Sequence, residues 1–359
     1  MTKNHPALQR AKSFCERFQL RVPVLLAPMA GACPPSLSIA VANSGGLGAC
    51  GALLMAPGGI LDWAADMRRG SSGPFQINLW VPDAPPQRDA LREAEVRRFL
   101  AGWGPEVPDA AGDAAPPDFA AQCDALIEAA PPVVSSVMGL YPPAFVARLK
   151  ARGIAWFATA TTLAEARAAE AAGADVVVAQ GMEAGGHRCA FDAAEAEREM
   201  VGLFALLPAV VDAVRIPVVA AGGIADGRGI AAALLLGASA VQVGTGFLRC
   251  PEAKINRAWA DALAITPPEG TIVSRAFSGR PGRSIATDYV KAATAPRAPS
   301  PAPYPVQRGL TAALREQGAK AGDIHRMQAW AGQSAAMSRA EPAAEVVRSL
   351  WRDAETLLA

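Results

Sequence analysis

The stretch Asp175-Val176-Val177-Val178-Ala179-Gln180-Gly181-Met182-Glu183-Ala184-Gly185-Gly186-His187-Arg188 joins a continuous apolar run to a loop rich in glycine and charge. The apolar run predicts a buried strand, so the loop follows the carboxyl end of that strand. Adjacent glycines let the backbone turn sharply and let a ligand come close. Glu183, His187 and Arg188 add an acid, a group that titrates near neutrality and a fixed cation. This cluster is a candidate site; the alternative is a structural histidine beside a simple turn.

Short apolar runs, most of them followed by a helical segment, recur along the chain. The eight predicted strands are 24–27, 46–49, 75–79, 133–136, 155–158, 175–179, 217–220 and 240–243. Helices between them are predicted over 34–44, 59–69, 143–152, 163–172, 200–214 and 227–236. Continuous apolar runs are typical of parallel strands that are covered on both faces. Eight such units over about 250 residues predict an α/β fold, a TIM (β/α)8 barrel rather than an open doubly wound sheet.

Two segments interrupt the alternation. Residues 82–130 are rich in proline and charge and read as an insertion, with helices predicted near 89–100 and 119–129. After residue 256 the pattern is irregular, with a proline-rich tract at 295–305 and helices predicted near 310–318 and 342–358. The sequence therefore predicts a barrel formed by residues 1–81 and 131–256, and a smaller cap domain over its mouth formed by residues 82–130 and 257–359.

Composition excludes several classes of function. Half of the 359 residues are hydrophobic, which is enough for a sizeable core. The net charge of +1, without long runs of one sign, argues against a nucleic-acid or membrane-binding surface. Six scattered cysteines without a CxxC pair, and three histidines, argue against disulfides and against a metal site.

No targeting or membrane segment is expected either. Residues 1–12 read as a polar arm that lacks the apolar core of a signal peptide. The most apolar tract, 230–243, is too short and too interrupted to span a bilayer. We therefore expect a cytoplasmic protein.

The predicted strand ends indicate a ligand. Reacting groups of a TIM barrel lie at the carboxyl ends of its strands, and phosphates commonly bind after strands seven and eight. Gly222-Gly223 and Gly244-Thr245 occupy those two places, each expected before a helix, where backbone N–H groups would form an anion cradle. Asn78 and Gln180 supply amides that can bind the edge of a heteroaromatic ring. A cradle, amides and one histidine without metal ligands suggest FMN.

Several segments resemble the nitronate monooxygenase family, formerly called 2-nitropropane dioxygenases. They are 27–30, 76–78, 180–188, 241–245, 277–281 and 330–333, and the match covers nearly the whole chain. The resemblance implies an FMN-containing TIM barrel with a smaller cap and a catalytic histidine at His187. It places FMN contacts at Pro28, Met29, Ala30, Asn78, Gln180, Gly185, Gly222, Gln242, Gly244 and Thr245.

The resemblance also implies a reaction. An alkyl nitronate, with propionate 3-nitronate as one candidate, would be oxidised by molecular oxygen to a carbonyl compound and nitrite, which detoxifies nitro compounds. His187 would hold the nitronate oxygens or remove the α-proton of a neutral nitroalkane. A monomer and a homodimer both remain open.

Neighbouring residues carry further expectations. Glu183 is expected to brace the loop. Arg188 is expected to be a surface residue or an ion-pair partner; the alternative is that it adds positive potential at the substrate. Cys189, where many relatives carry glycine, suggests a slightly different path for the loop beyond Arg188, because cysteine adopts a positive φ only at a cost. The aromatic residues expected to line an apolar lid are Tyr289, Tyr304 and Trp330.

Rival functions share the Glu-Ala-Gly-Gly-His motif. A flavin-dependent enoyl-ACP reductase and NADH:quinone reductases of similar build carry it, and they need a reduced nicotinamide to reach the flavin. A non-catalytic flavin-binding barrel is a third alternative. The sequence leaves the use of NAD(P)H and the physiological nitronate open, because barrels host many chemistries.

Overall fold

Parallel strands form the centre of the protein. The computed structural model describes residues 5–359. One sheet holds eight strands in the order β1-β9-β8-β6-β5-β4-β3-β2. They are β1 Val24–Leu26, β2 Gly48–Gly51, β3 Phe75–Trp80, β4 Val133–Val137, β5 Ala155–Ala160, β6 Val176–Gln180, β8 Val218–Ala221 and β9 Ala240–Val243. A backbone bridge between Leu25 and Leu47 links the two ends of the sheet, and the predicted TIM barrel is confirmed.

Helices cover the outside of the barrel. They are α2 Pro35–Asn43, α3 Pro57–Gly70, α5 Phe119–Ala129, α6 Pro143–Ala151, α7 Leu163–Ala171, α8 Leu203–Ala213, α9 Gly227–Leu235 and α14 Ala343–Leu358. Local sequence fixes their starts: Thr162 and Glu165 form a reciprocal capping box at the beginning of α7. α14 packs against α9 and α2, the place that the last helix of a barrel takes.

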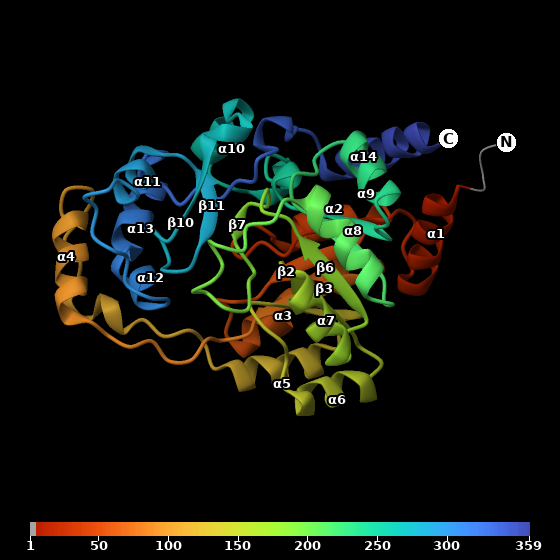
Figure 1. Cartoon of the computed structure of the whole chain (residues 1–359), viewed down its shortest axis with the longest axis horizontal. Coiled ribbons are helices and arrows are strands. Elements are labelled where there is room, and N and C mark those ends of the chain that lie inside the picture. The colour runs from red at the N-terminus through yellow and green to blue at the C-terminus, as the bar shows by residue number, and fades with distance from the viewer. Residues whose placement is uncertain (1–4) are drawn as a thin grey trace.

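A second group of elements, the cap, lies beside the barrel mouth. Its helices are α4 Ala90–Leu100, α10 Arg257–Ile265, α11 Asp288–Ala293, α12 Val306–Leu310 and α13 Ala312–Ala321. A small sheet joins β10 Thr271–Ser274, β11 Gly282–Ile285 and β7 Gly186–His187. Figure 1 shows α4 of the insertion beside α12 and α13 of the C-terminal segment. Their shared apolar cluster includes Val96, Leu100, Phe277, Tyr289 and Leu314, so the two segments pack together.

Two helices predicted in cap segments pack against the barrel instead. α5 contacts α3, and α14 contacts α9 and α2. Leu126 of α5 and Leu350 of α14 are fully buried in the main core cluster. An apolar face on each helix makes burial against the barrel favourable. The division of the chain into two domains at the stated boundaries stays a prediction.

The N-terminal segment forms a helix. The expectation of a polar arm over residues 1–12 is wrong from residue 6 onward, because α1 spans Pro6–Phe18; residues 1–4 lie outside the described part. The His5 side chain accepts a hydrogen bond from Ala7 N and caps the helix. Phe14 packs with Phe157 and with residues at the amino ends of the strands. α1 therefore lies far from the cap helices (Figure 1).

No helix within residues 5–359 is both long enough and apolar enough to cross a bilayer. Over the same residues, no three side chains of His, Cys, Asp or Glu are grouped as a metal would require.

Candidate active site

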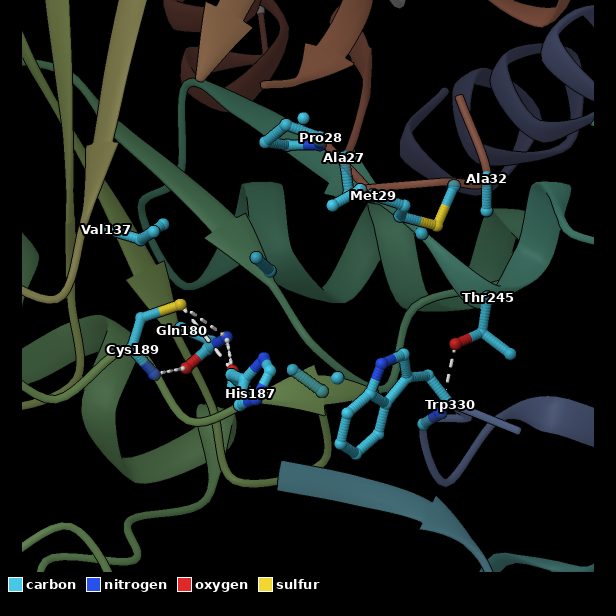
Figure 2. Close-up of a pocket in the computed structure, with 18 of the residues that line it drawn as sticks. Ala27, Pro28, Met29, Ala32, Val137, Gln180, His187, Cys189, Thr245 and Trp330 are labelled. Carbon is cyan, nitrogen blue, oxygen red and sulfur yellow. Dashed lines mark hydrogen bonds between the residues drawn. The ribbon is translucent and has the colours of Figure 1, made fainter. Parts of the chain in front are cut away.

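The carboxyl ends of the strands and the cap enclose a cavity of about 410 Å³. Every predicted site residue lines it, namely Pro28, Met29, Ala30, Asn78, Gln180, Gly185, His187, Gly222, Gln242, Gly244 and Thr245. Figure 2 shows Pro28 and Met29 on one side of this space, with His187 and Trp330 facing it from the other. The structure thus brings together residues that lie more than two hundred positions apart in the chain.

Gln180, the last residue of β6, fastens the histidine loop to the barrel. Its Oε1 accepts from Cys189 N at 2.9 Å, and its Nε2 donates to His187 O at 3.1 Å and to Cys189 Sγ at 3.2 Å (Figure 2). The sequence suggested that this amide binds a ring edge, but its donors and one acceptor position are used within the loop. Cys189 is not among the residues with positive φ; Gly186 takes that conformation, at φ +74°.

The loop is also held by the cap. His187 and Gly186 form β7 and pair with Gly282 and Arg283 of β11. A Cβ on Gly185 would lie 2.4 Å from the backbone N of Gly332, so only glycine fits where barrel loop and cap cross.

Two charged residues of the motif have structural contacts. Glu183 accepts a hydrogen bond from Leu203 N at 2.9 Å, at the start of α8, and so braces the loop as expected. Arg188 is buried, and its guanidinium donates to the backbone carbonyls of Gln180, Thr161 and Glu199. The expectation of a surface or ion-paired Arg188 is therefore wrong. Carbonyl groups left free at the strand ends need donors, and Arg188 supplies them.

His187 is oriented by a cap residue. Its Nε2 lies 2.7 Å from Ser278 Oγ, which accepts from Arg280 N and donates to Arg280 O. The imidazole lies between the rings of Trp80 and Trp330, each 4.9 Å away between centroids. Nδ1 has no hydrogen-bond partner within residues 5–359. Because the Ser278 hydroxyl donates to Arg280 O, it must accept a hydrogen bond from the imidazole. Nε2 therefore carries the imidazole proton, and Nδ1 keeps a free lone pair.

The surroundings keep this imidazole neutral. Burial, with smaller contributions from the positive charges of Arg280 and Arg308, lowers the pKa of His187 to about 3. A neutral imidazole with an unprotonated nitrogen can act as a base or a hydrogen-bond acceptor. An anion bound beside it would favour the protonated form.

The glycine turns after β8 and β9 fit a phosphate. Gly223, Ile224 and Thr245 line the cavity, and within residues 5–359 their backbone N–H groups donate no hydrogen bond to the protein. Gly222 and Gly223 have positive φ values of 110° and 71°, which favour glycine. Adjacent free N–H groups make an anion cradle.

The second turn leads into short 3-10 helices before the predicted α-helix begins. Gly244 leads into a three-residue 3-10 helix, Thr245–Phe247, and the next α-helix begins only at Arg257. Thr245 Oγ1 instead accepts from Gly332 N of the cap at 2.9 Å. A second short 3-10 helix, Pro251–Ala253, follows, and the helix expected after residue 251 is α10.

The amides fit the edge of a flavin ring. Gln76 Nε2 donates to Leu26 O and to Gln242 Oε1, at 3.1 and 3.2 Å. This fixes the Gln242 carboxamide, whose Nε2 has no partner among the described residues. Asn78 Nδ2 donates to Ser135 Oγ at 3.1 Å, which leaves its Oδ1 as an acceptor. One donor and one acceptor suit a heteroaromatic ring with N–H and C=O groups.

Sequence reasoning missed some lining residues. Trp80 stacks on Tyr304, with ring centroids 4.6 Å apart. Trp80 lies two residues after Asn78 on β3 and so shares its strand face, and this spacing could have identified Trp80 as a lining residue. Arg308 and Arg315 of the cap carry no such signal. Of the aromatic residues expected in the lid, Tyr304 and Trp330 line the cavity. Tyr289 does not, because it is buried in the apolar cluster of the cap.

Comparisons with known proteins agree with this geometry. A family model described as nitronate monooxygenase matches residues 12–353. The chain is 40% identical over 337 residues to a protein named nitronate monooxygenase from Paraburkholderia phytofirmans, with 92% of each covered.

Two solved structures are similar as well. Nitroalkane oxidase from Streptomyces ansochromogenes is 38% identical, with a TM-score of 0.85 over 95% of this chain and 98% of that one. FabK from Thermotoga maritima is 26% identical, with a TM-score of 0.75 over 96% of each. The chain belongs to the nitronate monooxygenase family and is an oxidoreductase.

Proposed function

We propose that this chain oxidises alkyl nitronates with molecular oxygen, in an FMN-dependent reaction that yields a carbonyl compound and nitrite and so detoxifies nitro compounds. The observation that carries the proposal is a neutral His187 whose Nδ1 is free in a cavity lined by unpaired backbone N–H groups. Similarity to a nitroalkane oxidase supports the same chemistry. Propionate 3-nitronate is our candidate substrate.

FMN is the proposed cofactor. The turns at Gly222-Gly223 and Gly244-Thr245 would hold its phosphate, and Asn78 and Gln242 would contact the ring edge. The remaining contacts would come from Pro28, Met29, Ala30, Gln180 and Gly185, which line the same cavity. FMN would supply the capacity to accept electrons from the nitronate.

The chain's own residues would bind the substrate and move a proton. Nδ1 of His187 would accept the α-proton of a neutral nitroalkane, and the protonated imidazole would then pair with the nitronate oxygens. Ser278 would keep the imidazole in the productive orientation through Nε2. The stacked rings of Trp80 and Tyr304 would keep water away from the reacting carbon.

Anaerobic mixing tests the function. Purified protein is mixed with propionate 3-nitronate and, separately, with NADH, while the visible absorbance of the oxidised flavin is followed. We expect the nitronate to reduce the flavin and NADH to leave it oxidised. Denaturation should release FMN and not FAD. Release of FAD, or of no flavin, would contradict the proposed cradle.

Reduction by NADH alone would favour a second candidate, an NAD(P)H-dependent quinone or enoyl-ACP reductase. The similarity to FabK is the observation behind this candidate. Reduction by neither compound would favour a non-catalytic flavin-binding barrel. Size measurements in solution would decide between a monomer and a homodimer.

A further inference from the structure

Arg308 carries a positive charge that faces the cavity without a partner. It belongs to α12 and lines the cavity from the cap side. Within residues 5–359, its guanidinium makes no hydrogen bond and no ion pair. Burial lowers the pKa of Arg308, with a smaller opposite effect from Tyr304, so desolvation of this cation is not offset by a carboxylate. Burying a charge without an opposite charge is costly, and a bound anion would offset that cost.

The neighbouring Arg315 is different, because each of its three guanidinium nitrogens donates to the protein. Its Nη2 donates to Arg308 O at 2.9 Å, its Nε to Thr311 Oγ1 at 3.2 Å and its Nη1 to Gln328 Oε1 at 3.4 Å. Arg315 therefore holds the backbone of Arg308 in place. Of these two arginines that line the cavity, Arg308 is the one whose guanidinium has no hydrogen-bond partner among residues 5–359.

No carboxylate within residues 5–359 pairs with that guanidinium. Glu183 is the only acidic residue among those that line the cavity, and its carboxylate accepts hydrogen bonds from Leu203 N. Arg308 and His187 line the same cavity, and the positive charge of Arg308 contributes to the lowered pKa of the His187 imidazole. A ligand that reaches His187 is thus within the field of a free cation.

We propose that Arg308 is a specificity-determining residue that binds a carboxylate on the substrate, while the nitronate group of the same molecule lies beside His187. One free planar guanidinium matches one planar monoanionic carboxylate through two parallel hydrogen bonds. This inference rests on the proposed function, and it assigns substrate preference to one residue of the cap.

Matched substrates test the inference. Propionate 3-nitronate and propyl-1-nitronate have the same carbon number, and only the first carries a carboxylate. In the FMN-loaded enzyme, Arg308→Gln should raise KM for propionate 3-nitronate about 10- to 100-fold, the loss expected for one charged hydrogen-bonded pair. KM for propyl-1-nitronate should change less than about threefold. The kcat values for both nitronates should stay unchanged, because the lost contact stabilises the bound substrate and the transition state equally.

Two further variants sharpen the result. Arg308→Lys keeps the charge but loses the planar fork, so its KM for propionate 3-nitronate should lie between those of wild type and Arg308→Gln. Arg98→Gln alters an exposed arginine of α4 that does not line the cavity, and it should leave both substrates unaffected. Equal KM changes for both substrates in Arg308→Gln, or no change for either, would overturn the inference.

A binding measurement separates this inference from the proposed function. If wild-type enzyme oxidises neither nitronate, the proposed function is wrong. Calorimetric titration with 3-nitropropionate and 1-nitropropane then tests carboxylate binding by Arg308 separately. Arg308→Gln should weaken binding of 3-nitropropionate and leave 1-nitropropane unchanged. Equal affinities for 3-nitropropionate in wild type and variant would reject the role of Arg308.

Discussion

His187 Nε2 lies 2.7 Å from Ser278 Oγ, so a hydroxyl group of the cap orients the imidazole of a barrel loop. The contact leaves Nδ1 free toward the cavity. Barrel and cap therefore have to be assembled before the histidine adopts its working orientation.

Ser278→Ala tests this relationship. Without the hydroxyl, Nε2 loses its partner and the imidazole can rotate or change tautomer. We expect kcat/KM for a neutral nitroalkane to fall about tenfold, the value of one hydrogen bond to a group that becomes charged. FMN content should stay normal, since Ser278 does not line the cavity. Steady-state kinetics with nitroethane and ethyl nitronate would check this, and equal losses on both substrates would argue against an orienting role.

His187→Asn tests the proposed base. Asparagine keeps a hydrogen-bonding side chain but cannot accept a proton from carbon. Turnover of a neutral nitroalkane should fall about 10²–10⁴-fold, while turnover of the preformed nitronate should fall much less. Flavin absorbance of the purified variant serves as the control, because the proposed phosphate contacts lie on other strands. Complete loss of flavin would indicate a structural histidine, and unchanged turnover of both substrates would remove His187 from the reaction.

The pH dependence of stability should also report on His187. Its pKa in the folded protein is about 3, below the value of about 6.5 expected in the unfolded chain. The unfolded state therefore binds more protons below pH 6.5, and the free energy of unfolding should fall as the pH drops from there toward 3. Between pH 7 and pH 5 this residue should account for about 1–2 kcal/mol. Urea unfolding of wild type and His187→Asn at both pH values would measure it; equal pH dependence in the two proteins would contradict the prediction.

The barrel was predictable because its strands are buried on both faces. Runs such as Val176–Gln180 then consist almost entirely of apolar residues, and the sequence pattern is unambiguous. α1 was missed because its buried residues Ala7, Ala11 and Phe14 are separated by residues that are mostly polar. The strands β10 and β11 were missed because each has only four residues and contains polar residues as well as apolar ones.

The site was predictable as a set of residues, but not as a set of contacts. The motifs predicted that Gln180 and His187 lie near Thr245, because all of them follow barrel strands. They did not predict that the Gln180 amide bonds to its own loop, because residue type alone does not name a hydrogen-bond partner. Ser278 reaches His187, and Arg308 reaches the cavity, only through packing of the cap, which no local pattern encodes.

Gly185→Ala should disturb the junction between barrel and cap. The new Cβ would lie 2.4 Å from Gly332 N and 2.6 Å from Ala331 C, which are backbone atoms that cannot move aside singly. Overpacking of this kind costs about 1–3 kcal/mol, so the midpoint of thermal unfolding should fall by several degrees. Gly58→Ala is the matched control, because its Cβ meets nothing within 4 Å and the residue lies in α3, where alanine is favoured. Gly185→Ala should also raise KM for nitronates, since the displaced loop carries His187; a variant as stable and as active as Gly58→Ala would show that barrel and cap do not need this close approach.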